Sequence, residues 1–271
     1  IVADAGSPET ICAGASVTLG GSPTATGGDG NFSYVWSSTP AGYSANTSNP
    51  LVTPAATTIY RVDVTDGNGC TGNASKLVSI EAIPSSPTAS SPVPVCVGGA
   101  IHDLTASGSG GDLNWYDDAG LTNNVFTGSP FATGQTAAGD YTYYVTETSA
   151  NGCEGPATAV TLTINPAIVA DAGSPETICA GASVTLGGSP TATGGDGNFS
   201  YVWSSTPAGY SANTSNPLVT PAATTIYRVD VTDGNGCTGN ASKLVSIEAI
   251  PSSPTASSPV PVCVGGAIPD L

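Results

Sequence analysis

The sequence has very few basic residues. Only four of its 271 residues are Lys or Arg, against 20 Asp or Glu, so the formal net charge is −16. Binding to nucleic acid requires a cationic face that displaces counterions from phosphates, and attraction to an anionic membrane surface requires basic clusters. We therefore expect neither as a partner. The four basic residues are Arg61, Lys76, Arg228 and Lys243.

Long apolar segments and methionine are also missing. No apolar run approaches the roughly 18 residues that a membrane-spanning helix needs, so we expect no direct membrane insertion. No segment keeps an apolar period of about 3.6 residues, which predicts that the chain has no substantial helix. The chain starts and stops inside a repeating pattern and contains no Met, so we expect it to be a window on a longer array.

Residues for catalysis are equally scarce. The one histidine, His102, is replaced by Pro269 in a later copy of the same repeat, which argues against a general base. Asp117 and Asp118 form the one adjacent acidic pair, and neighbouring residues of a turn do not face each other across a cleft as glycosidase carboxylates do. The motifs GxSxG and HExxH are absent. We therefore predict that the protein is not an enzyme.

Internal repetition is the strongest positive feature. Residues 1–101 are identical to residues 168–268. Within this long period a shorter order recurs three times, namely a cysteine, a tryptophan, an alternating strand and an Asn-Gly-Cys turn. The three sets are Cys12, Trp36 and Cys70; Cys96, Trp115 and Cys153; and Cys179, Trp203 and Cys237.

The alternating stretches predict an all-β fold. In residues 58–65 the apolar Tyr60, Val62 and Val64 would point to one face and their neighbours to the other. Asn-Gly tolerates the positive φ of a tight turn, so it predicts a chain reversal between strands. We expect β-sandwiches in which Trp36, Trp115 and Trp203 are core residues. The predicted domains are 1–83 (first type), 84–167 (second type), 168–250 (first type again) and 251–271 (the truncated start of another second-type domain).

The seven cysteines recur at similar spacings. No close pair such as CxxC is present, so disulfides are favoured over a metal site, and disulfides indicate an extracellular location. The repeated spacings of 58, 57 and 58 residues predict one bridge within each domain, each contributing roughly 4 kcal/mol through loop closure. Cys263 is left over. The predicted bridges are Cys12–Cys70, Cys96–Cys153 and Cys179–Cys237.

These motifs resemble a known group of repeats. The second domain resembles the Ig-like domains found in tandem on large surface proteins of Bacteroidetes bacteria, and the first domain is similar to related PKD-like or Ig-like repeats. The motifs of the second domain are PVPVC at 92–96, NWY at 114–116 and NGC at 151–153. Those of the first are ICAG at 11–14, YVW at 34–36 and DGNGC at 66–70. The cysteines differ from those of antibody domains, because they flank strands instead of lying within them.

The resemblance implies a secreted adhesin or fibre, of which the gliding-motility adhesins are the best-known type. Junctions that are very short, or hold four prolines as residues 83–94 do, favour an elongated array. We expect a structural stalk at the cell surface whose partners are neighbouring copies of the same repeat. Two alternatives are a filament whose arrays bundle laterally, and a set of carbohydrate-binding modules attached to a secreted enzyme.

The sequence raises two classes of ligand, surface glycans and calcium. Surface glycans are possible partners, with Tyr43 and Tyr210 in loops as the best contact residues. We expect no cofactor. Calcium is the one metal that the sequence raises, because Asp63, Asp66 and Asn68 lie close together, as do Asp29 and Asn31. Their spacing does not match an EF-hand loop, and turns also require Asp or Asn beside Gly.

Overall fold

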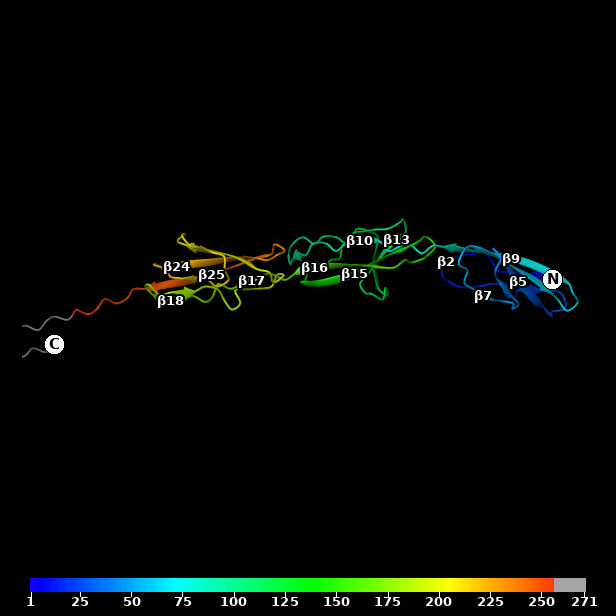
Figure 1. Cartoon of the computed structure of the whole chain (residues 1–271), viewed down its shortest axis with the longest axis horizontal. Coiled ribbons are helices and arrows are strands. Elements are labelled where there is room, and N and C mark those ends of the chain that lie inside the picture. The colour runs from blue at the N-terminus through cyan, green and yellow to red at the C-terminus, as the bar shows by residue number, and fades with distance from the viewer. Residues whose placement is uncertain (256–271) are drawn as a thin grey trace, which may run out of the picture. The chain divides into compact units, whose positions relative to one another are not determined.

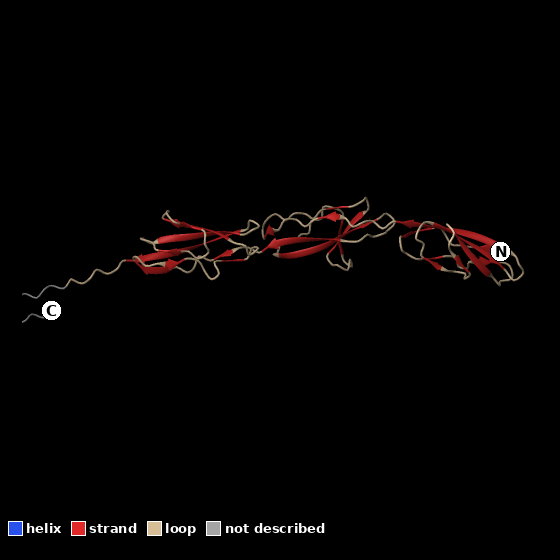
Figure 2. Ribbon diagram, viewed as in Figure 1, coloured by secondary structure: helices blue, strands red, loops and turns tan. Residues whose placement is uncertain are grey.

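The computed structural model describes residues 1–255, and every regular element there is a strand (Figure 2). The strands form three tandem Ig-like β-sandwiches, so the predicted all-β class is confirmed. By their contacts they divide into two compact units. The first contains residues 1–94 and 100–164, and the second contains residues 95–99 and the described residues from Asn165 onward. Cys263 and most of the predicted fourth domain lie outside the described residues.

The first sandwich is built on a five-stranded sheet with two short strand pairs opposite it (Figure 1). The sheet runs in the order β2 (Glu9–Cys12), β9 (Thr71–Glu81), β8 (Thr58–Thr65), β5 (Ser33–Thr39) and β6 (Ser44–Ala45). The pairs are β1 (Val2–Ala3) with β4 (Ala25–Thr26), and β3 (Val17–Thr18) with β7 (Leu51–Val52). Strand β2 runs parallel to β9, with Cys12 opposite Glu81, whereas β8 is antiparallel to both of its neighbours.

The third sandwich repeats this plan. Its sheet has the order β18 (Glu176–Cys179), β25 (Thr238–Glu248), β24 (Thr225–Thr232), β21 (Ser200–Thr206) and β22 (Ser211–Ala212). Its pairs are β17 (Val169–Ala170) with β20 (Ala192–Thr193), and β19 (Val184–Thr185) with β23 (Leu218–Val219).

The second sandwich has a related sheet. Its order is β11 (Val95–Cys96), β16 (Thr158–Asn165), β15 (Gly139–Thr148), β13 (Asp112–Tyr116) and β14 (Asn124–Thr127). Strand β10 (Thr88–Ala89) pairs with β12 (Ala106–Ser107), and an isolated bridge joins Leu104 to Phe131.

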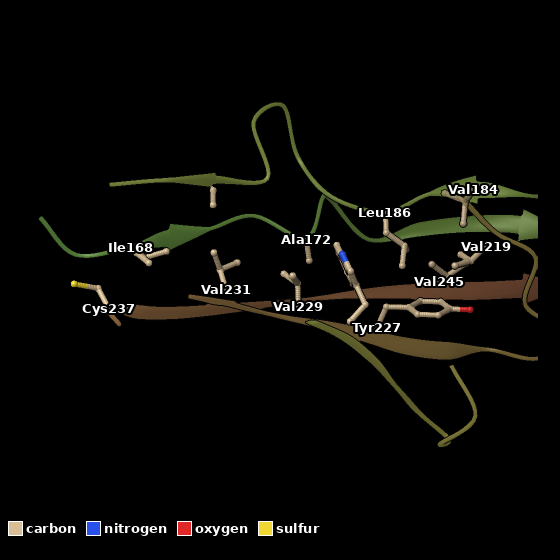
Figure 3. Packing of buried hydrophobic residues seen from close by; sticks show 12 residues of the cluster. Ile168, Ala172, Val184, Leu186, Val219, Tyr227, Val229, Val231, Cys237 and Val245 are labelled. Carbon is tan, nitrogen blue, oxygen red and sulfur yellow. The ribbon is translucent and has the colours of Figure 1, made fainter. Parts of the chain in front are cut away.

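Strand alternation and tryptophan burial produce the cores. Along β8, Tyr60, Val62 and Val64 are buried, while the residues between them face solvent. The three tryptophans are fully buried, and each indole N–H donates to a backbone carbonyl. Trp36 donates to Thr47, Trp115 to Gly128 and Trp203 to Thr214. Figure 3 shows the third core, where Val229 and Val231 of β24 face Ala172 and Ile168.

The predicted chain reversal at Asn-Gly lies between β8 and β9. Gly69 adopts a φ of 81°, which is a left-handed conformation that favours glycine. The Asp66 carboxylate closes the turn by accepting the backbone N–H groups of Asn68 at 3.0 Å and Cys70 at 2.8 Å. This turn fixes the position of the cysteine that follows it.

Candidate functional site

The disulfides connect consecutive sandwiches. Cys12 is bonded to Cys153 and Cys96 to Cys237, with Cα–Cα distances of 5.5 and 5.6 Å and a sequence separation of 141 residues in both cases. The predicted pairing within each domain was wrong. Among the described residues, Cys70 and Cys179 are free and exposed.

The strand geometry explains why Cys12 and Cys70 do not form a disulfide. Cys12 lies opposite Glu81, the last residue of β9, whereas Cys70 directly precedes Thr71, the first residue. The two cysteines therefore lie at opposite ends of a strand about 33 Å long. A disulfide requires Cα atoms roughly 4.4–6.8 Å apart, so these two cannot bond.

The same reason applies to the other two predicted bridges. Val97, next to Cys96, donates its N–H to Asn165 at the end of β16, whereas Cys153 precedes that strand. Cys179 pairs with Glu248 at the end of β25, whereas Cys237 precedes its start. The sequence contains cysteine pairs 141 residues apart as well as pairs 57 or 58 residues apart. Choosing the bonded pairs requires knowing at which end of a sandwich each cysteine lies.

Polar contacts surround the bridge between the first and second sandwiches. The Glu81 carboxylate accepts hydrogen bonds from the side chains of Ser149 and Asn151, both in the turn that carries Cys153. These two hydrogen bonds, with that of Ser149 contributing most, lower the pKa of Glu81 below its ordinary value of 4.5. Ser149 Oγ also accepts the backbone N–H of Cys153 at 3.2 Å. The residues that flank the bridge on both sides are thus bonded to one another.

The linker between these two sandwiches is held against the second one. Thr158 Oγ1 donates to the Pro87 carbonyl at 2.6 Å. Gly155 is buried so close to the Pro84 carbonyl that a Cβ at this position would collide with it. The proline-rich linker therefore packs along one edge of the second sandwich over part of its length.

The second bridge lies in the other compact unit. Cys237 is only 3% exposed and belongs to the core cluster of the third sandwich, against which Cys96 packs. Nearby, Gly195 donates its N–H to the Pro166 carbonyl at 3.0 Å, and Gly194 has no room for a Cβ because of the Ala167 carbonyl. Cys237 is labelled at one end of this core in Figure 3.

The remaining sequence candidates have ordinary structural roles. His102 is exposed. Asp118 accepts the backbone N–H groups of Asn123 and Thr122, which lower its pKa, the former contributing most. Asp117 accepts the side-chain N–H of Asn123, so both carboxylates organise one turn.

The acidic residues considered for calcium are bonded within the protein. Asp29 Oδ1 accepts the N–H groups of Asn31 and Gly67, and Asp63 forms an ion pair with Arg61 at 2.7 Å. Within residues 1–255 there is no cluster of three or more His, Cys, Asp or Glu side chains arranged to hold a metal ion. The same part of the chain has no helix long and apolar enough to cross a membrane.

The predicted glycan contacts are partly covered. Tyr43 is half-buried and packs edge-on against Tyr60, with ring centroids 5.3 Å apart, and Tyr210 packs in the same way on Tyr227. Burial, followed by the neighbouring Tyr60, raises the pKa of Tyr43. A surface hollow of about 620 Å³ lies on the second sandwich, and its lining includes Phe131, Gln135, Asp140 and Tyr141.

Comparison with known proteins supports the Ig-like assignment of one segment. Residues 84–166 match a family model described as Ig-like domain CHU_C associated. Among curated proteins, none matches the sequence.

The solved structures that resemble this chain include Ig domains of titin and two bacterial adhesins. One is a mutated variant of three Ig domains of titin, with 14% identity, a TM-score of 0.47 and coverage of 90% of this chain and 96% of that one. Another is a 1.5-MDa bacterial ice-binding adhesin, with 19% identity, a TM-score of 0.36 and coverage of 88% and 94%. A third is a Ca²⁺-stabilized adhesin of an Antarctic bacterium, with 15% identity, a TM-score of 0.36 and coverage of 91% and 73%.

Fold and bridges together define the class of protein. The chain is a tandem Ig-like repeat protein with disulfide bonds, and such bonds persist in oxidising, extracellular surroundings.

Proposed function

We propose that the chain forms part of the stalk of a secreted bacterial adhesin or fibre, extended from the cell surface. The observation that carries this proposal is that its disulfides join one sandwich to the next. A bridge within a domain stabilises that domain, whereas a bridge between domains restrains the joint. An array of small domains under tension needs joints that do not separate when it is pulled, and a covalent bridge across each joint provides this.

The sequence identity between copies supports the same function. Strands, loops and linker are unchanged over 101 residues of the repeat. A repeated spacer tolerates such uniformity because any unit can replace another, and only the total reach matters. Binding sites for different ligands would instead favour variation in the loops.

Deletion of one repeat from the full-length gene tests the proposal. The cut removes 167 residues, from one Ile-Val-Ala-Asp start to the next, so the alternation of domain types and the spacing of 141 residues between bonded cysteines are preserved. We expect a surface fibre shorter by two domains in electron micrographs, and cell attachment nearly unchanged. Loss of attachment, with secretion and fibre assembly intact, would show that the repeat itself binds the ligand.

A second candidate function rests on the hollow of the second sandwich. Its lining combines aromatic rings (Phe131, Tyr141) with polar groups (Asp140, Gln135), a combination that suits a sugar ring. If the domains are carbohydrate-binding modules, a polysaccharide should retain the chain during native affinity electrophoresis, and Tyr141→Ala should abolish that retention. Unchanged mobility on a panel of surface polysaccharides would remove this candidate.

A further inference from the structure

The hollow on the second sandwich lies where one strand of the sheet ends before its neighbour does. Strand β13 ends at Tyr116, which is paired with Tyr144 of β15, so β13 does not extend along Gly139–Tyr143, which pair with β16. The lining comes from this half of β15, from Asp117 just beyond the end of β13, and from the loop that begins at Phe131. The unequal lengths of the two strands therefore leave the space for the hollow.

The apolar part of the lining is held in place by an aromatic cluster. Phe131 is buried, and its ring contacts those of Trp115, Phe126 and Tyr143, with centroids 5.5, 5.1 and 5.2 Å away. A ring fixed on three sides cannot rearrange when a ligand arrives. It therefore offers a preformed apolar surface against which a sugar ring can pack.

The polar side chains on β15 and the loop are oriented by hydrogen bonds within the sandwich. The Tyr141 hydroxyl donates to the Ala137 carbonyl at 3.1 Å, and Gln135 Nε2 donates to the Tyr143 hydroxyl at 3.0 Å. Since these groups are already ordered, a ligand that contacts them loses little affinity to restricting their motion.

Two carboxylates complete the lining, those of Asp117 and Asp140. Asp140 Oδ1 accepts the Thr163 hydroxyl at 2.6 Å, and Asp117 accepts the side-chain N–H of Asn123 at 2.9 Å. An ionised carboxylate has about four acceptor positions. Both carboxylates are thus oriented by the protein and still have positions with which to accept hydrogen bonds from a ligand.

No Lys or Arg of the chain is available to neutralise these carboxylates. Residues 77–227 contain neither residue type. Each of the four basic residues forms an ion pair with an acidic residue of its own sandwich: Arg61 with Asp63, Lys76 with Glu9, Arg228 with Asp230, and Lys243 with Glu176. A cation that pairs with the carboxylates of the hollow must therefore come from a ligand.

We propose that the hollow binds a sugar that carries a protonated amine, such as a glucosamine residue. The aromatic surface receives the sugar ring, and Asp117 and Asp140 receive the ammonium group, whose three N–H donors suit two carboxylates. The same carboxylates disfavour uronic-acid polymers, because like charges repel. This proposal rests on the second candidate function, to which it adds the class of sugar.

NMR titration of the whole chain with two matched trisaccharides tests the proposal. Tri-glucosamine and its fully N-acetylated counterpart have the same rings, but only the first is cationic at mildly acidic pH. At low ionic strength we expect a Kd at least about tenfold lower for tri-glucosamine, with shifts of the amide signals of Gly139–Tyr143. The preference should shrink as salt is added, because the carboxylates are exposed.

Substitution of the carboxylates assigns the preference to the hollow. Asp140→Asn keeps an oxygen that can accept the Thr163 hydroxyl, so the fold should persist while the charge is lost. This variant and Asp117→Asn should each reduce the preference for the amine severalfold. Unchanged preference in both variants would overturn the proposal.

Asp112 provides the matched control. It is exposed and lies at the opposite end of β13 from Asp117, and Asp112→Asn changes the net charge by the same amount. This variant should bind tri-glucosamine as the native chain does. If it weakens binding as much as Asp140→Asn does, the attraction comes from the overall charge of −16 and the proposal is wrong.

The remaining outcomes separate this proposal from the carbohydrate function on which it rests. Equal affinity for the two trisaccharides would keep a sugar site and overturn the role of the amine. Binding of neither would also overturn the proposal, and the carbohydrate function would then depend on the polysaccharide panel alone. A trilysine peptide that binds as tightly as tri-glucosamine would show that the hollow recognises a cation without a sugar, which contradicts the proposal as well.

Discussion

Glu81 and Glu248 occupy equivalent positions in identical sequences, but their surroundings differ. Glu81 is half-buried and accepts hydrogen bonds from the turn of the second sandwich, and its pKa is lowered. Glu248 is exposed. The contribution of a single carboxylate to a joint can therefore be measured with a control of the same sequence context.

The joint at Glu81 should weaken in acid. A carboxyl whose folded pKa is depressed contributes stability above its unfolded pKa, and loses that contribution as the pH falls through the folded value. Glu81→Gln should thus lower the thermal midpoint at pH 7, and the difference from wild type should shrink as the pH falls below about 4.5. Glu248→Gln should have a smaller effect at every pH. Equal effects of the two substitutions would show that the hydrogen bonds to Glu81 do not stabilise the joint.

Trp36 should be the most costly core side chain of the first sandwich to truncate. It is fully buried, and its indole N–H donates to Thr47 at 3.0 Å. Trp36→Ala should lower the free energy of unfolding by about 3–5 kcal/mol. Val35 on the same strand is 61% exposed, so Val35→Ala should change it by less than about 0.5 kcal/mol. Urea unfolding of both variants measures the difference, and similar midpoints would contradict the assignment.

At the scale of strands, the long elements could be predicted from the sequence, but several of the two-residue strands could not. The alternation in β8 and the Asn-Gly turn are local signals, so the sequence is sufficient for them. Strands such as β1 and β4 have two residues each, and they exist because distant segments meet in the sandwich. Such pairing is a tertiary property that no local pattern carries.

The disulfide partners required the same non-local knowledge. The sequence indicated that the cysteines flank strands, but not at which end of a sandwich each would lie. The parallel register of β2 with β9 decides this, because it sets Cys12 beside Glu81. Parallel pairing between an early strand such as β2 and the last strand of the domain, β9, has no sequence signature comparable to an Asn-Gly turn.

Gly155 should be essential for the fit of the linker. Its buried position leaves no space for a Cβ against the Pro84 carbonyl. Gly155→Ala should displace the linker, and the fraction of chains with the Cys12–Cys153 bridge should fall severalfold after refolding. Ser86→Ala, an exposed position of the same linker, serves as the control. Peptide mapping under non-reducing conditions provides the readout, and full bridging in Gly155→Ala would contradict the close contact.

At the scale of the whole molecule, the first prediction to check is which cysteines are joined by disulfides. We expect mapping of the oxidised chain to find Cys12 linked to Cys153 and Cys96 linked to Cys237. Bridges between residues 57 or 58 positions apart would instead support the pairing within domains. Cleavage at the four basic residues separates the two outcomes, because Cys12 and Cys70 then fall on different peptides from Cys153.

The two bridges also fix how far the molecule can be stretched after its sandwiches have unfolded. The shortest covalent route from Ile1 to Thr255 enters at Cys12, crosses to Cys153, returns to Cys96, crosses to Cys237 and continues to the end, roughly 86 residues of backbone. At up to about 3.6 Å per residue that is on the order of 310 Å, against about 910 Å for the reduced chain.

Single-molecule pulling should reveal this limit. Cys12→Ser should lengthen the route by only about 27 residues, because Cys96–Cys237 still shortens it, whereas loss of a bridge within one domain would release about 58. Under tension, force would pass through the segment between Cys96 and Cys153 from its C-terminal to its N-terminal end. The residues outside the shortest covalent route would carry no tension. The two bridges would therefore keep Ile1 and Thr255 within about 310 Å of each other even after every sandwich has unfolded.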